Sequence, residues 1–160
     1  ESSAASDVYK RQDLEYGPEY QDFTKKVQSF CKKYKGLSFK DRANTPLVSS
    51  GGSGGPEMHR SEWQKILIKN GYFARSVPKE YGGYGEEADI IKSTIIAAEF
   101  SKSKTPTTMV GQGIDMLVHP LLERGTEEQK QAYIKPTLHG EMIWCQGYSE
   151  PNAGLSLIHI

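Results

Sequence analysis

The sequence is poor in cysteine, has no long hydrophobic run and carries no excess charge of either sign. Its two cysteines, Cys31 and Cys145, lack nearby partners, which argues against a disulfide scaffold or a zinc site. No apolar run approaches the roughly 20 residues that cross a bilayer, and no secretory signal opens the chain. The 20 basic residues balance the 20 acidic ones, so charge does not favour nucleic acid as a partner. A length of 160 residues then predicts one soluble domain, or one domain with part of a second.

The two ends of the sequence look foreign to the rest. With one choice of codons for Asp7–Gln12, the reverse complement of that DNA encodes the same residues as Leu155–Ile160. Such an inverted repeat is typical of the adapter that transposon-based sequencing leaves on a DNA fragment, and a chance match between two unrelated hexapeptides is the alternative. We therefore expect residues 1–12 and 155–160 to derive from an adapter, and residues 13–154 to be an internal slice of a longer gene.

Apolar periodicity and capping signals predict five helices in the native segment. The expected ranges are 20–34, a helix from Ser61 to a stop at Gly71, 87–102, 106–122, and a helix from Thr126 that Pro136 terminates. Ser61 with Gln64, and Thr126 with Gln129, have the spacing of a capping box.

Details of four segments follow from the same patterns. The helix over 87–102 is expected to bury one apolar face, made of Ile90, Ile91, Thr94, Ile95, Ala98 and Phe100. In the helix over 106–122, Gly111 and Gly113 are expected to let another group approach the backbone closely. Residues 43–56, rich in glycine, serine and proline, predict a flexible surface loop, and residues 78–85 (PKEYGGYG) predict a turn.

After these helices, residues 142–149 favour an extended strand, followed by the loop EPNAG. This stretch, WCQGYSEPNAG, combines an aromatic ring, a hydroxyl and a carboxylate with glycines, so it can present Ser149 and bare main chain to a flat or anionic ligand. A turn at a domain junction would have the same composition. Elsewhere, the four histidines have no ligand or triad spacing, and Gly111-Gln112-Gly113 is not a dinucleotide fingerprint because no strand precedes it.

Four blocks resemble the N-terminal part of acyl-CoA dehydrogenases, in order and at matching separations. They are Trp63–Leu67 with Gly71-Tyr72, then VPKEYGGYG, then HPLLERGTEEQKQAYIKPTLHGE, and finally WCQGYSEPNAG. The resemblance implies a mostly α fold, in which residues 13–140 form the N-terminal helical domain and residues 141–154 begin a truncated, β-barrel-like middle domain. It also implies FAD as the cofactor, and removal of an α proton and a β hydride from an acyl-CoA thioester, with the hydride passing to flavin N5.

The resemblance also assigns site residues. Gln146, Gly147, Tyr148 and Ser149 match the strand of the family that contacts the flavin, with Ser149 bonding the ring. Gly154, with Ala153, matches the start of an AGSD turn, in which adapter-derived Leu155 stands in place of the serine. Gln112 falls where family members line the blind end of the acyl pocket, although helix packing is an equal alternative.

The same family places its catalytic glutamate in a C-terminal helical bundle, and Glu150 cannot replace it because it belongs to the turn motif. We therefore expect this polypeptide itself to be inactive. The implied partners of the parent protein are an acyl-CoA substrate and an electron-transfer flavoprotein, and the parent is expected to be a homo- or hetero-tetramer. The expected compartment is the cytoplasm of a bacterium or the mitochondrial matrix of a eukaryote. The competing interpretations are an oxidase or monooxygenase of the same fold, and a helical interaction module without a cofactor.

Overall fold

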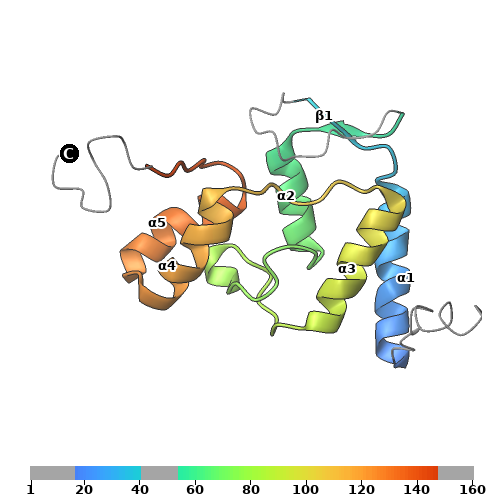
Figure 1. Ribbon diagram of the computed structural model, residues 1–160, viewed down its shortest axis with the longest axis horizontal. Helices are drawn as coiled ribbons and strands as arrows, with labels where there is room; N and C mark the ends of the chain where they lie inside the picture. Colours follow the sequence, from blue (N-terminus) through green and yellow to red (C-terminus); the bar gives the residue numbers. More distant parts are fainter. Residues whose placement is uncertain (1–16, 41–53, 148–160) are drawn as a thin grey trace, which may run out of the picture.

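The computed structural model describes residues 17–40 and 54–147, which form an elongated array of helices. In chain order the helices are α1 (Pro18–Lys33), α2 (Arg60–Lys69), the 3₁₀ turn η1 (Lys79–Tyr81), α3 (Ile90–Ser103), the π-helical segment η2 (Gly113–Leu117), α4 (Val118–Arg124) and α5 (Glu127–Leu138). Figure 1 shows α1 and α3 at one end and α4 and α5 at the other, with α2 between them.

Two apolar clusters hold the helices together. The first joins α1, α2 and α3 around Phe30, whose ring stacks on Trp63 at 5.5 Å and on Phe100 at 6.0 Å between centroids. The second joins the far side of α2 to α4, α5 and η1 through Ile68, Val118 and Ile134, among other residues. Since α2 contributes to both clusters, it connects the two ends of the molecule.

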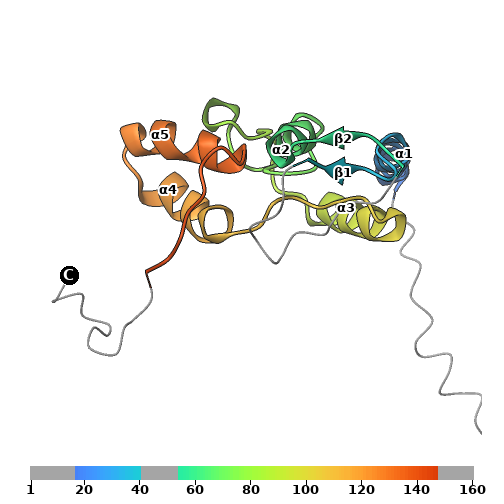
Figure 2. The same cartoon turned by 90° about the horizontal axis from the view of Figure 1, so that it is seen from above.

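A short parallel pair of strands, β1 (Ser38–Phe39) and β2 (Glu57–Met58), connects α1 to α2. Figure 2 shows this pair between the two helices. The amide of Ser38 donates to the Pro56 carbonyl at 3.0 Å, and that of Lys40 donates to the Met58 carbonyl at 3.1 Å. Two-residue strands leave no alternation for sequence periodicity to detect, which explains why they were not predicted. Of the loop predicted over 43–56, residues 43–53 lie outside the described residues.

Helix α1, the turn over 78–85 and the start of α5 agree with the predictions. Gly82 has a φ of +85°, which a turn built on glycine requires. The capping box of α5 is present, because the amide of Gln129 donates to Thr126 Oγ1 at 3.3 Å and the amide of Thr126 donates to Gln129 Oε1 at 2.9 Å. Gly71 follows α2 with a φ of +72°, as expected of a helix stop.

The predicted cap of α2 is wrong. The helix begins at Arg60, and the backbone amide of His59 donates to Glu62 Oε2 at 2.9 Å. Ser61 lies inside the first turn, and Gln64 is fully buried instead of closing a box at the surface. The capping box of α2 is instead formed by His59 and Glu62.

The buried face predicted for α3 is also partly wrong. The helix begins at Ile90, where the Asp89 carboxylate accepts from the amide of Lys92 at 2.9 Å. The side chain of Ile90 is 82% exposed, and the buried face consists of Ile95, Ile96 and Phe100. Thr94 and Ala98 are exposed, whereas Ile91 is half-buried. Adjacent apolar pairs at 90–91 and 95–96 leave the face ambiguous, and contact with α1 selects it.

Two helix boundaries differ from the predictions. Residues 105–110 have no regular secondary structure, so the helix expected over 106–122 begins only at η2. Pro136 does not end α5, which continues to Leu138. The burial of Ile134, Thr137 and Leu138 compensates for the hydrogen bond that a proline removes from the last turn of a helix.

Candidate functional site

The described chain ends in a segment that leaves α5 and passes the beginning of η2 (Figure 2). Gly140, with a φ of +69°, reverses the chain, and the amides of Glu141 and Met142 both donate to the Pro136 carbonyl, at 2.9 Å and 3.1 Å. Residues 142–147 form no strand, which corrects the predicted one. A strand requires a neighbour to exchange hydrogen bonds with, and none lies beside this segment in the described part of the chain.

Trp144 anchors this segment on α5. Its indole Nε1 donates to Thr137 Oγ1 at 2.8 Å, and the Thr137 hydroxyl donates in turn to the Tyr133 carbonyl at 2.6 Å. The ring of Tyr133 meets the indole edge-on, with centroids 5.6 Å apart. A Cβ on Gly113 would collide with Trp144 Cδ1 and lie 2.9 Å from Thr137 Cγ2. The close approach predicted for Gly113 is thus confirmed, and its neighbour is the indole of Trp144.

The start of η2 is irregular. Gly111 has a φ of +155°, and a Cβ there would have nothing within 4 Å, so this glycine serves the backbone conformation and not a close approach. The amide of Gly111 donates to Asp115 Oδ2 at 3.1 Å, and the amide of Asp115 donates to the Gly111 carbonyl at 2.9 Å. Segments of π-helix occur frequently at functional sites, and this one faces Trp144.

A small cavity of about 80 Å³, which we call the Gln112 cavity, lies between these two segments. One wall consists of residues 109–114, and the other of residues 140 and 142–144 with Thr137. Ile143 in the lining of this cavity is 79% exposed, so the cavity has an apolar side chain at the surface. The half-buried Gln112 is a polar group in an otherwise mostly apolar lining.

The structure brings only some of the predicted site residues together. Gln112 lies in the cavity wall, and Gln146 and Gly147, two and three residues after Trp144, are exposed. Within the described residues, neither Gln146 nor Gly147 makes a hydrogen bond, and a Cβ on Gly147 would meet no atom within 4 Å. Tyr148, Ser149 and Gly154 lie outside the described residues. Among the described residues, the main chain at 146–147 is therefore exposed.

Charged groups lie beside Gly140. Lys65 Nζ and Glu141 Oε1 are 2.6 Å apart, and the Lys65 hydrogen bond lowers the pKa of the Glu141 carboxyl. Burial lowers the pKa of His139, against the opposing effect of Glu141. His139 is thereby kept neutral to lower pH than an ordinary histidine.

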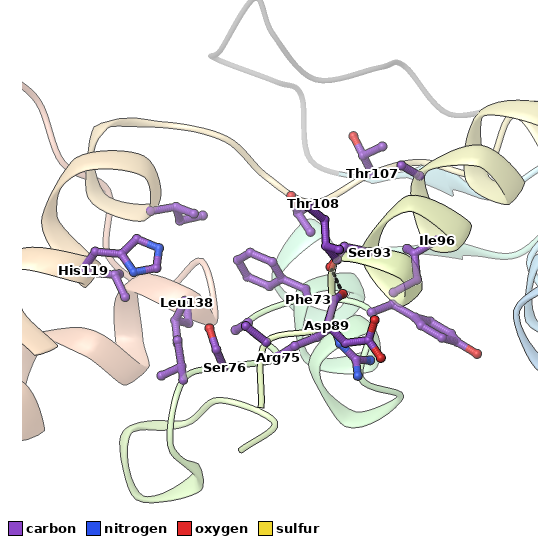
Figure 3. A pocket seen from close by; sticks show the side chains of 18 of the residues that line it. Phe73, Arg75, Ser76, Asp89, Ser93, Ile96, Thr107, Thr108, His119 and Leu138 are labelled. Carbon is purple, nitrogen blue, oxygen red and sulfur yellow. Dashed lines mark hydrogen bonds between the residues drawn. The ribbon is translucent and has the colours of Figure 1, made fainter. Parts of the chain in front are cut away.

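Two features escaped prediction. Gln64, from the middle of α2, hydrogen-bonds the backbone of Met109 in one cavity wall and that of Leu138, which lies next to the wall residue Thr137. A glutamine between Trp63 and Leu67 was the available signal. The second feature is a larger, mostly apolar groove of about 660 Å³, lined by residues 72–77 and parts of α3, η2, α4 and α5. Figure 3 shows Phe73, Leu138 and His119 around it, with Ser93 donating to the Asp89 carbonyl at 2.9 Å. Its lining comes from five separate segments, so sequence spacing gives no signal for it.

Two searches of the described residues are negative. Residues 17–40 and 54–147 contain no group of three or more histidine, cysteine or acidic side chains that could hold a metal ion. None of the helices described is long and apolar enough to span a membrane.

The sequence matches the family described as "Acyl-CoA dehydrogenase, N-terminal domain" over residues 37–141. The chain is 32% identical to acyl-CoA dehydrogenase IpdE1 of Mycolicibacterium smegmatis over 101 residues, which are 63% of this chain and 25% of that protein. It is 37% identical to the short-chain specific acyl-CoA dehydrogenase of Clostridium acetobutylicum over 101 residues, 61% of this chain and 26% of that protein. The chain thus spans about a quarter of the length of these relatives.

Among solved structures, the crystal structure of the ChsE4-ChsE5 complex from Mycobacterium tuberculosis is similar. It aligns with a TM-score of 0.53 and 24% identity, covering 92% of this chain and 34% of that one. At this identity the likeness concerns the fold alone, which is the arrangement of helices seen in Figure 1.

Proposed function

The chain belongs to the acyl-CoA dehydrogenase family and forms its N-terminal helical domain, and from this we propose that the parent protein is an FAD-dependent dehydrogenase of acyl-CoA thioesters. Bound FAD would supply the acceptor for the hydride that leaves the β carbon of the acyl group. The residues of this chain would bind and orient the flavin edge and the acyl end, while the catalytic base lies outside this chain.

The observation that carries the proposal is the position of the open main chain at Gln146–Gly147. The Trp144 indole holds the segment on Thr137, and two residues later the backbone is exposed with its donors free of partners among the described residues. Main-chain donors that follow a fixed anchor can bond the edge of an isoalloxazine ring and stabilise the charge that it acquires on reduction. We propose that Tyr148 and Ser149 continue this edge, that the Ser149 hydroxyl bonds the ring, and that Gly154 begins the turn near the phosphates.

The Gln112 cavity is proposed to receive the far end of the acyl chain. Its mostly apolar lining and the exposed apolar side chain of Ile143 fit an alkyl group better than a charged one. Gln112 would limit how deeply the chain enters, because burying its amide against a methylene group without a hydrogen bond is unfavourable.

The proposal has four further parts. Residues 1–12 and 155–160 are proposed to be adapter-derived because of their inverted repeat. From the family we propose that the catalytic base belongs to a part of the parent protein that this polypeptide lacks, so that the polypeptide as written is inactive. Electrons would pass to an electron-transfer flavoprotein. The similar solved structure is a complex of two named chains, which favours a multi-subunit parent.

The test is to complete the gene beyond residue 154, without the adapter ends, and to purify the whole protein. We expect a yellow protein that releases FAD on denaturation and oxidises acyl-CoA with an electron-transfer flavoprotein as acceptor. The 160-residue chain assayed in parallel should give no turnover above a heat-treated control. A colourless, well-folded full-length protein would contradict the proposal and favour a helical interaction module, whereas turnover that depends on oxygen would favour an oxidase.

A further inference from the structure

Gln64 is a polar side chain in the most buried part of the molecule. It lies in the middle of α2 with 0% exposure, between the two apolar clusters, and its neighbours Trp63 and Leu67 are equally enclosed. Burying an amide is unfavourable unless both its donor and its acceptor are bonded. Its hydrogen-bond partners therefore explain why an apolar residue does not occupy this position.

Both partners of Gln64 are backbone groups that lack a partner of their own in regular structure. The side-chain Nε2 donates to the Leu138 carbonyl at 3.1 Å, and this carbonyl is among the last of α5, where no helical amide remains to bond it. The side-chain Oε1 accepts from the amide of Met109 at 2.9 Å, in the irregular segment before η2. Since a carbonyl only accepts and an amide N–H only donates, these partners fix the orientation of the Gln64 amide.

The two bonded segments lead into the two walls of the Gln112 cavity. Met109 begins the first wall, and Leu138 lies between Thr137 and Gly140, which both belong to the second. The walls also touch here, because a Cβ on Gly140 would lie 2.8 Å from Met109 Sδ and 3.8 Å from Gln64 Cγ. At the opposite end of the walls, Gly113 packs against Trp144. The separation of the walls is therefore set at two places, and Gln64 is one of them.

From this geometry we infer that Gln64 is a positioning residue: its side-chain amide ties residues 109 and 138 together and thereby sets the width of the Gln112 cavity. The acyl nature of the ligand rests on the proposed function, whereas the positioning of the walls does not. Gln64 touches neither the cavity nor a reacting atom, so its influence on a ligand passes through the two backbones that it bonds.

The first experiment measures amide and indole hydrogen exchange by NMR in the 160-residue chain. Gln64→Met keeps the volume and removes both hydrogen bonds. We expect exchange to accelerate at least about tenfold at the Met109 amide and the Trp144 indole, with amides of α1 and α3 changed less than about twofold. The matched control is Leu67→Ala, one turn along α2. It should accelerate exchange at amides of α1 and α3 more than at the Met109 amide.

Uniform acceleration in both clusters by Gln64→Met, in the same pattern as by Leu67→Ala, would overturn the inference, because Gln64 would then only contribute to general stability. Should Gln64→Met not fold, Gln64→Leu removes the same two hydrogen bonds with a smaller side chain and gives the same comparison. Protection should then fall at the Met109 amide and the Trp144 indole and be kept in α1 and α3. Equal loss at all of these sites, or no loss at Met109 and Trp144, would again contradict the inference.

The second experiment uses the completed, flavin-loaded protein and a series of acyl-CoA substrates of increasing chain length. We expect Gln64→Met to raise KM for the longest acyl chains accepted by about tenfold and to leave kcat with the shortest within about twofold, since only the far end of the pocket changes. An equal loss of kcat for every chain length would contradict this role. If the completed protein binds no flavin, the proposed function fails, while the exchange measurement still decides whether Gln64 positions the walls.

Discussion

Gly113 and the indole of Trp144 are in contact so close that no side chain fits between them. A Cβ at residue 113 would collide with Trp144 Cδ1 and would lie only 2.9 Å from Thr137 Cγ2. This contact joins the π-helical segment to the chain that leads towards Gln146 and Gly147. It therefore fixes where the proposed flavin-facing main chain begins relative to the Gln112 cavity.

Gly113→Ala should destabilise the chain by about 1–3 kcal/mol, because the added methyl forces the indole or the backbone to move. Urea unfolding followed by circular dichroism measures the change. Gly147→Ala is the matched control, since a Cβ there has no atom within 4 Å, and it should change stability by less than about 0.5 kcal/mol. Equal stability of the two variants would show that the Gly113 contact does not hold in solution.

The hydrogen bond from Trp144 to Thr137 should appear as a coupling between the two side chains. Trp144→Phe removes the donor and Thr137→Val removes the acceptor, while both replacements keep most of the apolar volume. A double-mutant cycle should give a coupling of about 0.5–1.5 kcal/mol. Strictly additive effects would mean that the indole is held by packing alone.

The chain should become less stable at alkaline pH, because the Tyr81 hydroxyl ionises there. Its hydroxyl donates to Glu127 Oε2 at 2.8 Å, and this hydrogen bond, with burial, raises the pKa of Tyr81 to about 12 from an ordinary 10.0. Because the folded-state pKa is raised, the stabilisation is fully present below the unfolded value and disappears as the pH rises from 10.0 to about 12. The melting temperature of the unsubstituted chain should fall as the pH rises across this range.

Tyr81→Phe should remove that part of the alkaline loss, since the titrating group is gone. Glu127→Gln is the informative companion, because it keeps a hydrogen-bond acceptor without the negative charge and should bring the phenol's titration closer to its ordinary pKa. An ultraviolet titration of tyrosinate follows the phenol directly. If both variants lose stability with rising pH as the unsubstituted chain does, the Tyr81–Glu127 hydrogen bond is not the cause of the alkaline loss.

Ser149→Ala in the completed protein should lower flavin occupancy and shift the flavin's reduction potential to a more negative value. The proposed hydroxyl bond favours the reduced, more negative ring, so its loss makes reduction harder. Ser101→Ala, which removes an exposed hydroxyl from α3, is the control and should change neither quantity. Occupancy is measured by absorbance after purification, and the potential by a dye-coupled titration. An unchanged potential would exclude Ser149 from the flavin edge.

The sequence correctly predicted the features that depend only on residues close together in the chain. The capping box of Thr126 and Gln129, the stop at Gly71 and the glycine turn at Gly82 each depend on a few neighbouring residues, and each is present. The apolar residues of α1 fit a single face of a helix, and the predicted helix is confirmed. At the start of α2 the cap lies at His59 and not at the predicted Ser61, and the spacing of residues in the sequence did not indicate this.

The sequence by itself determined the family, through four ordered motifs, and with it the helical fold and the residues to search for a cofactor site. Only the tertiary structure decided that Gln64 is enclosed and ties two distant backbones together, and that Ile90 is exposed while Ile96 is buried. It also placed Gln112 in a cavity wall opposite Trp144. The physical reason is that helix signals act over three or four residues, whereas burial and cavity walls depend on partners separated by many residues in the chain.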